Sequence, residues 1–198
     1  DTKKTKLYQQ DQDRKVASKS FISVEEYLSS LDLKIHVESG WDIPIPRVAQ
    51  LTQKTNQFNL TTKRYTEVEI EVMQASGSFE IYSFELGDRY GNYGTTGVAI
   101  IRLDKLSGSA IIDTFLMSCR VIGRNVEFQF FNKIIKMLKE IKINTLEASY
   151  IQTHKNNQVC DFYENLGFEF TSGGKEIKNY NLRLHGFEPK KIQYISEI

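Results

Sequence analysis

The sequence predicts an α/β protein with a mixed β-sheet, and two observations carry this prediction. Ranges 78–86, 96–103 and 109–119 read as strands joined by short turns, which is the pattern of an antiparallel meander. From residue 126 to 184, helix-period and strand-period segments alternate, and this order indicates a β-α-β-α unit. Joining the meander to this unit gives a sheet with antiparallel and parallel neighbours, covered by helices.

Composition favours one ordered domain with a short extension. The 198 residues are 40% hydrophobic and 26% charged with a net charge of +1, which excludes disorder and a general nucleic-acid binder. Two cysteines do not make a disulfide framework, so a reducing cytoplasm is expected. No segment reaches the roughly 18 apolar residues of a membrane helix, so no membrane partner is expected. His36, His154 and His185 lack ligand spacing, and no metal is predicted.

The N-terminal third begins with a polar stretch and continues with short helices and a strand that are separated by breaks. The chain starts at Asp1 rather than Met, and we expect it to be part of a longer protein, with residues 1–31 as a helical linker. Ser23 and Glu26 have capping-box spacing, as do Thr66 and Glu69. From these caps, from Pro44 and Pro46 and from the hydrophobic periodicity, we predict helices at 24–31, 47–58 and 66–75 and a strand at 33–37.

The remaining elements follow from periodicity in the same way. A glycine-rich stretch, 87–94, is predicted as the connection of the first hairpin, and 104–108 as the second turn. Apolar residues recur at helical spacing from Val126 to Ile141, which predicts a long amphipathic helix. A strand at 144–150, a helix at 156–166 and strands at 168–170 and 177–184 complete the order.

The stretch from Ser118 to Glu127 links the third strand of the meander to the long helix. Arg120 and Arg124 flank Gly123 there, and a strand that turns into a helix start presents backbone N–H groups and the positive end of the helix dipole. This pattern predicts a site for an anion such as phosphate or pyrophosphate. The alternative is a tight turn with surface arginines.

The element order and this loop resemble the GNAT acyltransferase fold. In that family an Arg/Gln-x-x-Gly-x-Gly/Ala loop holds the pyrophosphate of the pantetheine cofactor. Arg120 and Gly123 match the pattern, whereas Asn125 takes the sixth position in place of Gly or Ala. The resemblance implies a coenzyme A or phosphopantetheine site at Arg120, Val121, Ile122, Gly123, Arg124 and Asn125. It also implies a groove between the strands at Met117 and Leu146.

A second segment resembles the same family. Asn156 to Phe168 reads NNQVCDFYENLGF, similar to the GNAT pattern Asn-x6-Tyr-x3-Gly-Phe. The resemblance implies that Asn156 contacts the pantetheine amides and that Tyr163 is the general acid for the leaving thiolate. The alternatives are a helix cap for Asn156 and a packed core side chain for Tyr163.

Longer strings resemble FkbH-like proteins. They cover 51–65, 88–94 and 118–124. Members of that family join a phosphatase-like domain of the haloacid dehalogenase (HAD) superfamily to a GNAT-like domain, and they are associated with unusual extender units on acyl carrier proteins. The resemblance implies that 1–31 follows a HAD-like domain and that 32–198 is the GNAT-like domain. The implied partners are that HAD-like domain and an acyl carrier protein.

Several residues remain candidates for chemistry. Asp88, Asp113 and Glu127 are candidate general bases. Cys119 is either a nucleophile, favoured by the nearby arginines and helix start, or a buried small residue on a strand.

Three functions follow from these residues and resemblances. The first is an acyltransferase-type domain that helps to move a glyceryl-like group from an acyl phosphate to a carrier-protein thiol. The second is a catalytically silent module that docks a carrier protein for the HAD-like domain. The third is an N-acetyltransferase that acts on an amine.

Overall fold

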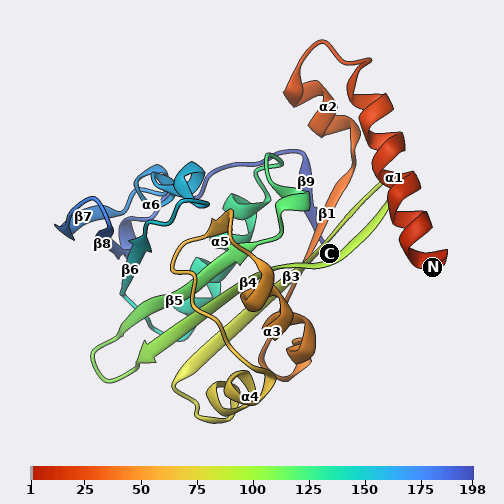
Figure 1. Ribbon diagram of the computed structural model, residues 1–198. Helices are drawn as coiled ribbons and strands as arrows, with labels where there is room; N and C mark the ends of the chain where they lie inside the picture. The colour runs from red at the N-terminus through yellow and green to blue at the C-terminus, as the bar shows by residue number, and fades with distance from the viewer. Residues whose placement is uncertain (1) are drawn as a thin grey trace.

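A nine-stranded mixed sheet organises the computed structural model, which describes residues 2–198 (Figure 1). The strand order is β7-β8-β6-β5-β4-β3-β1-β9, and β2 pairs with β5 outside this path. Neighbours are antiparallel except for two parallel pairs, β5 with β6 and β1 with β9. The predicted mixed α/β fold is confirmed. The strand bounds are β1 Leu33–Ser39, β2 Phe58–Asn59, β3 Phe79–Asp88, β4 Gly91–Asp104, β5 Ser109–Met117, β6 Thr145–Ile151, β7 Glu169–Gly173, β8 Ile177–Arg183 and β9 Ile195–Glu197.

Helices cover both faces of the sheet, so the apolar core has two layers. The larger layer contains the buried stripe of α5, including Phe130 and Ile134, and the smaller one contains Val48 of α3 and Ile70 of α4. The predicted apolar stripe of the long helix is therefore a core face. The helix bounds are α1 Thr2–Ser18, α2 Val24–Ser30, α3 Ile45–Lys54, α4 Glu67–Ala75, α5 Val126–Glu140 and α6 Phe162–Asn165.

Three local predictions were wrong, and strands β2 and β9 were not predicted. The helix predicted at 47–58 ends at Lys54, because Arg64 donates to the carbonyls of Thr52 and Thr55 and turns the chain away. The helix predicted at 156–166 is a 3-10 turn at 157–159 followed by the short α6. The hairpin of β3 and β4 is much tighter than the predicted 87–94 connection, since two register shifts let the strands pair through its glycines. Strand β9 was not foreseen, because three residues carry too little periodicity.

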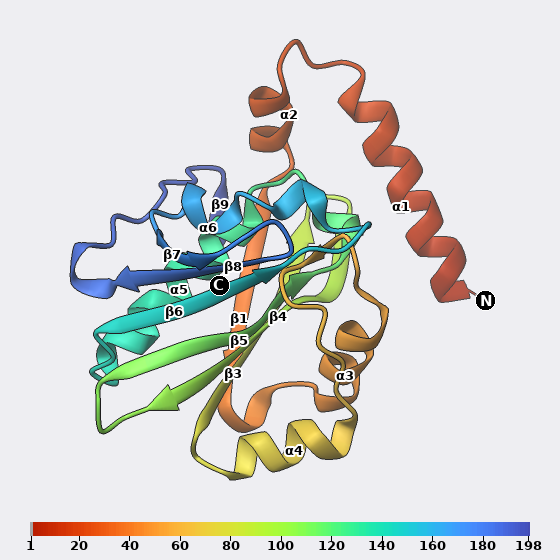
Figure 2. The ribbon, with the colours of Figure 1, turned by 60° about the vertical axis from the view of Figure 1, so that its left-hand side comes forward.

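Helices α1 and α2 project beyond one end of the sheet (Figures 1 and 2). Arg14 of α1 pairs with Asp88 of the β3–β4 hairpin at 2.7 Å between Nε and Oδ2, and both side chains are almost fully buried. Leu28 and Leu31 belong to the larger core layer. Helices α1 and α2 thus contact the sheet domain through Arg14 and Leu28, and the continuation of this segment into a HAD-like domain stays a prediction.

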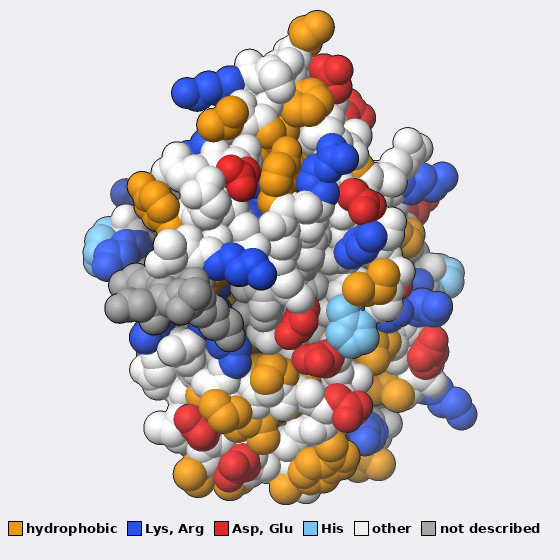
Figure 3. Space-filling view, turned by 90° about the vertical axis from the view of Figure 1, so that its right-hand side faces the viewer, with side chains coloured by type: hydrophobic (Ala, Val, Ile, Leu, Met, Phe, Trp, Pro, Cys, Tyr) orange, Lys and Arg blue, Asp and Glu red, His pale blue; other side chains and the backbone are white. Residues whose placement is uncertain are grey.

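The surface on the side of α1 shows no large patch of one charge sign. In Figure 3, Lys and Arg side chains are interspersed with Asp and Glu, and apolar side chains gather toward the end where α4 lies. The exposed apolar side chains near that end include Trp41, Val68 and Val72. Across residues 2–198, no helix is long and apolar enough to cross a membrane.

The capping box at α4 is expected to stabilise the fold measurably. Thr66 accepts from the amide of Glu69, and the Glu69 carboxylate accepts from the amide of Thr66 at 2.7 Å. Thr66→Ala should lower the free energy of unfolding by about 1 kcal/mol in urea titrations. Thr171→Ala, on the exposed strand β7, is the matched control, and equal stability of the two variants would contradict the capping role.

Candidate functional site

A cavity of about 740 Å³ opens beyond the carboxyl ends of β5 and β6, where helix α3, the loop after it and the loops after β5 and β6 meet. These two strands run parallel, and ligands of open α/β sheets bind at this kind of edge. The cavity is lined by Arg47, Leu51, Lys54, Thr55, Asn56, Gln57, Ser118, Cys119, Arg120, His154 and Lys155.

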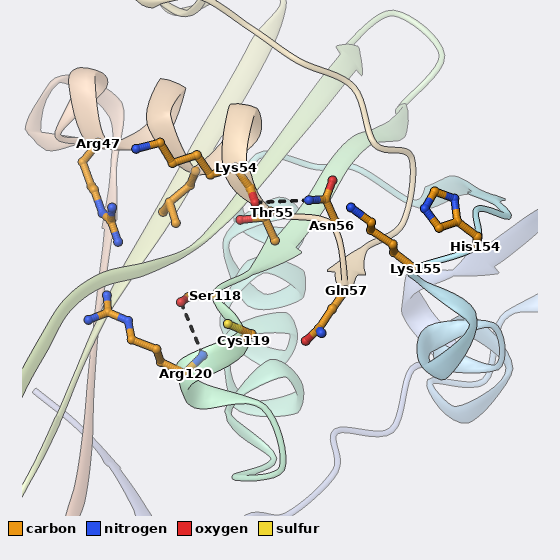
Figure 4. A pocket seen from close by; sticks show the side chains of 11 residues that line it. Arg47, Lys54, Thr55, Asn56, Gln57, Ser118, Cys119, Arg120, His154 and Lys155 are labelled. Carbon is orange, nitrogen blue, oxygen red and sulfur yellow. Dashed lines mark hydrogen bonds between the residues drawn. The ribbon is translucent and has the colours of Figure 1, made fainter. Parts of the chain in front are cut away.

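Positive charge dominates the lining of this pocket. Four of its residues are lysine or arginine, and among the described lining residues there is no carboxylate. Figure 4 shows the guanidinium groups of Arg47 and Arg120 directed toward each other on one side, with Lys155 on the other. Burial, followed by repulsion from Arg120, lowers the pKa of Arg47. Facing cations with no carboxylate among the described lining residues would favour an anionic ligand.

Cys119 lies in the wall of this pocket, between the two arginines and the Lys155 side (Figure 4). Strand β5 ends at Met117, and Cys119 begins the 3-10 turn Cys119–Val121, so its thiol is exposed. The interpretation of Cys119 as a buried strand residue was therefore wrong. Cys160, the other free cysteine, does not line the pocket.

The residues of the predicted phosphate loop are divided between the pocket and the protein interior. Arg120 lines the cavity, and its Nη2 donates to the carbonyl of Tyr93 at 3.3 Å. Val121 is buried, and Ile122 packs against the core. Gly123 has φ +82° and is exposed, as the predicted turn through glycine requires. Of the predicted loop residues, only Arg120 contributes to the cavity.

Arg124 and Asn125 are engaged by the protein itself. Arg124 donates to the carbonyl of Arg120 at 2.8 Å and to the hydroxyl of Tyr93 at 3.0 Å. Asn125 has φ +60°, a conformation in which Asn is the best-tolerated residue after glycine, and this accounts for Asn at the sixth loop position. Its amide donates to the hydroxyl of Tyr194 at 2.6 Å.

The groove expected between the strands of Met117 and Leu146, which are β5 and β6, is filled by β2. The two strands pair only as far as Ile112 and Ala148. Beyond this point β2 pairs antiparallel with the end of β5. The amide of Leu60 donates to the carbonyl of Phe115 at 3.2 Å, and the amide of Ile151 in β6 donates to the carbonyl of Leu60 at 2.8 Å. The segment 58–60 therefore bridges the diverging strands.

Burial anchors this segment firmly. Phe58, Asn59 and Leu60 are all buried, and the Phe58 ring packs on Phe162 with centroids 5.4 Å apart. Burying the two apolar side chains contributes about 3–6 kcal/mol. Polar residues around the segment support it: the Asn59 side-chain amide donates to the carbonyl of Thr55 at 3.1 Å, and the Asn59 side-chain oxygen accepts from the amide of Thr62 at 2.9 Å.

Asn156 contacts this segment. Its amide donates to the carbonyls of Asn59 and Ile151, both at 2.9 Å, and its oxygen accepts from the amide of Thr153 at 2.7 Å. Asn156 occupies the N-cap position of the 3-10 turn 157–159, as the helix-cap alternative predicted, but it makes no side-chain cap bond. A peptide carbonyl of the chain itself takes the place predicted for a pantetheine amide.

Tyr163 lies in the aromatic core. It is 1% exposed and packs against Phe168 and Tyr180. Burial raises the pKa of Tyr163 far above its ordinary value, and its hydroxyl has no hydrogen-bond partner within residues 2–198. Because Tyr163 does not line the pocket, the arrangement gives no support to its predicted role as general acid.

Two of the candidate bases are occupied by structural contacts. Asp88 accepts from Arg14, from the Tyr93 hydroxyl at 2.7 Å and from the amides of Tyr90 and Gly91. Burial opposes its charge, yet the bonds from Arg14 and Tyr93 outweigh burial and lower the pKa of Asp88.

Asp113 accepts from Lys63 at 2.5 Å and from the Tyr65 hydroxyl at 2.7 Å. Neither Asp113 nor Asp88 lines the pocket. Both carboxylates are thus placed as structural acceptors rather than as bases directed at a substrate.

Glu127 is buried in the first turn of α5, where burial raises the pKa of its carboxyl group. It also does not line the pocket, so the geometry gives its predicted role as a base no support.

Sequence reasoning missed Arg47, Lys54 and Lys155. A signal for the first two was available, because Arg47, Leu51 and Lys54 have i, i+4, i+7 spacing and share one helix face. Lys155 follows a strand parallel to the one that leads to Arg120, and parallel strands end at the same edge. What the sequence did not show is that α3 crosses this edge.

No protein-family model and no curated protein sequence matches this chain. Solved structures resemble it in fold. The ribosomal-protein-S18-alanine N-acetyltransferase of Escherichia coli superposes with a TM-score of 0.57 at 14% identity, over 76% of this chain and 94% of that one. YncA of Salmonella typhimurium, a putative acetyltransferase determined with its cofactor acetyl-CoA, gives 0.54 at 13% identity, over 80% and 99%.

An N-acetyltransferase of Staphylococcus aureus Mu50 gives a TM-score of 0.53 at 17% identity, over 77% of this chain and 98% of that one. The chain therefore has the GNAT acetyltransferase fold, as the sequence predicts. At these identities the likeness shows the fold alone, and the activity is argued from the pocket.

Proposed function

We propose that this chain is an acyltransferase-type domain in which Cys119 receives an acyl group from a phosphate-bearing donor and passes it to a thiol. One observation carries the proposal: an exposed thiol lies in a pocket whose charged lining residues are all cationic. Thiols form covalent acyl intermediates, and fixed cations bind and stabilise phosphate leaving groups.

The proposed acyl transfer needs no oxidant or reductant. The Cys119 thiolate attacks the carbonyl carbon of an acyl phosphate, and the bond from that carbon to the phosphate oxygen breaks. The C–O electron pair leaves with the phosphate, whose charge Arg47 and Arg120 are placed to bind. The thiolate of the acceptor then attacks the thioester carbon, and Cys119 leaves as thiolate.

The acceptor and the acyl group follow from the FkbH-like resemblance. Strings at 51–65, 88–94 and 118–124 support a carrier-protein phosphopantetheine as the acceptor thiol and a three-carbon glyceryl unit as the acyl group. The first string contributes Leu51, Lys54 and Thr55 to the pocket, and the third contributes Cys119 and Arg120. The two strings that line the pocket thus meet at the proposed reaction site.

A silent docking module is the second candidate, because the filled gap between β5 and β6 removes the place expected for a pantetheine arm. Acyl turnover by the chain rules this candidate out. An N-acetyltransferase acting on an amine is disfavoured by the pocket, since among its described lining residues no carboxylate is available to bind a cationic substrate.

Removing a pocket cation should weaken anion binding. Isothermal titration with inorganic pyrophosphate should show about tenfold lower affinity for Arg120→Ala, because one charge-assisted hydrogen bond of about 1.5 kcal/mol is lost. Arg102→Ala removes the same charge from an exposed position on β4 and is the matched control. Equal affinities of the two variants would show that the anion does not bind in this pocket.

A further inference from the structure

The segment 58–60 uses the backbone groups that the diverging strands would offer to a ligand. On the β5 side, Phe58 and Asn59 pair with Met117 and Leu116, and the Leu60 amide bonds the carbonyl of Phe115. On the β6 side, the Ile151 amide bonds the carbonyl of Leu60. This segment is thus a third strand held between the two parallel ones.

A pantetheine arm is an extended chain with two amides. Bound between parallel strands that part, it would need those same N–H and C=O groups as partners. Here the segment 58–60 of the chain itself occupies that position as an extended peptide. The Asn156 side-chain amide holds it there by donating to the carbonyl of Asn59 at 2.9 Å. Because Asn59, Leu60 and Asn156 are all fully buried, no room remains for a second chain.

We propose that the segment 58–60 is a specificity element that excludes the pantetheine arm of free coenzyme A from the sheet. Asn156 is its positioning residue, holding the segment through Asn59 and Ile151. This inference rests on the proposed function. Because the segment closes the sheet to the pantetheine arm, a thiol reaches Cys119 from the pocket side. The segment thereby favours acceptors presented from outside, such as a carrier-borne arm, over free coenzyme A.

Hydrogen exchange of the unmodified chain tests the exclusion without any acyl transfer. The amides of Leu60 and Ile151 should keep the same protection with and without millimolar coenzyme A, because the segment stays in place. Exchange accelerated by about threefold or more would mean that coenzyme A displaces the segment, and the proposal would be overturned. The proposed thioester on Cys119 is detected separately, so failure of one idea is distinguishable from failure of the other.

Loosening the segment provides the second test. Asn156→Ala, checked by circular dichroism to be folded, should accelerate exchange at Leu60 and Ile151 and should acquire coenzyme A binding in isothermal titration. Asn157→Ala, an exposed neighbour, is the matched control and should leave both unchanged. If the two amides in Asn156→Ala lose protection and coenzyme A still does not bind, the segment is not what excludes it. If those amides keep their protection, Asn156 is not the positioning residue.

Discussion

Cys119→Ser is expected to abolish acyl transfer, with a loss of about a thousandfold or more. A serine hydroxyl is almost entirely protonated at neutral pH, whereas a thiol ionises readily and is intrinsically more nucleophilic. Intact mass spectrometry after incubation with an acyl phosphate should show one acyl group on the unmodified chain and none on the variant. Treatment with hydroxylamine should remove that group, since it cleaves thioesters.

The matched control is Cys160→Ser, which removes the second free thiol at a position outside the pocket. This variant should be acylated on Cys119 to the same extent as the unmodified chain. Acylation that persists in Cys119→Ser, or that maps to Cys160, would contradict the proposed role of the pocket thiol. A chain that is not acylated at all would favour the silent docking module.

Asp88→Asn should lower the free energy of unfolding by about 3–5 kcal/mol, because it leaves the Arg14 guanidinium buried without its counter-charge. The Asp88 side chain is 0% exposed and that of Arg14 is 5% exposed, so water cannot replace the lost interaction. Loss of the same contacts should also free α1 from the hairpin. Urea unfolding measures the stability, and proteolysis near α1 measures the release of the helix.

The contribution of Asp88 should depend on pH in a defined direction. Its pKa is lowered in the folded protein, so the unfolded chain binds the proton more tightly and acid favours unfolding. The stabilisation is fully present above the unfolded value, about 3.9, and is lost as pH falls through the lower folded value. The stability difference between the unmodified chain and Asp88→Asn should therefore narrow below about pH 4.

Asp42→Asn, at an exposed position in the turn before α3, is the control for this experiment. Its free energy of unfolding should stay within about 0.5 kcal/mol of that of the unmodified chain at neutral pH. If Asp88→Asn matches that small effect, the buried ion pair does not hold α1 against the sheet.

The network around Asp88 also connects the hairpin to the pocket. Tyr93 donates its hydroxyl hydrogen bond to Asp88, accepts one from Arg124, and offers its backbone carbonyl to Arg120. One residue thus joins the buried ion pair, the strand-to-helix loop and the pocket wall. The sequence placed Asp88 on a hairpin and proposed it as a base, because a carboxylate in a glycine-rich turn has no visible partner until Arg14 is brought beside it.

Local patterns in the sequence predicted most of the elements. Period-two alternation placed β3, β4 and β5, and the periodic stripe from Val126 to Ile141 placed α5 within one residue of its observed bounds. The Thr66 capping box placed the start of α4. These predictions succeeded because caps and amphipathic periodicity act between residues a few positions apart.

The candidate site was predicted only where it lies on one continuous stretch. The sequence marked Arg120 through the strand, glycine and helix start around it, and it left Cys119 open between a nucleophile and a buried strand residue. The structure places both side chains in the pocket. Arg124 and Asn125 belong to the same stretch, yet their side chains turn to Tyr93 and Tyr194, which come from distant segments. A loop motif specifies the backbone turn, whereas packing decides which side chains face a ligand.

By itself, the sequence determined the mixed α/β fold, the turn after β5 and the arginine that this turn presents. Only the tertiary structure decided what these residues face. It brought Arg47 and Lys54 across the sheet edge to make the pocket cationic, and it laid the segment 58–60 between β5 and β6. The cationic pocket and the placement of this segment both depend on contacts between residues about fifty to one hundred positions apart in the sequence. The burial of Phe58 and Leu60 and the hydrogen bond from Asn156 to Asn59 stabilise the segment in its place.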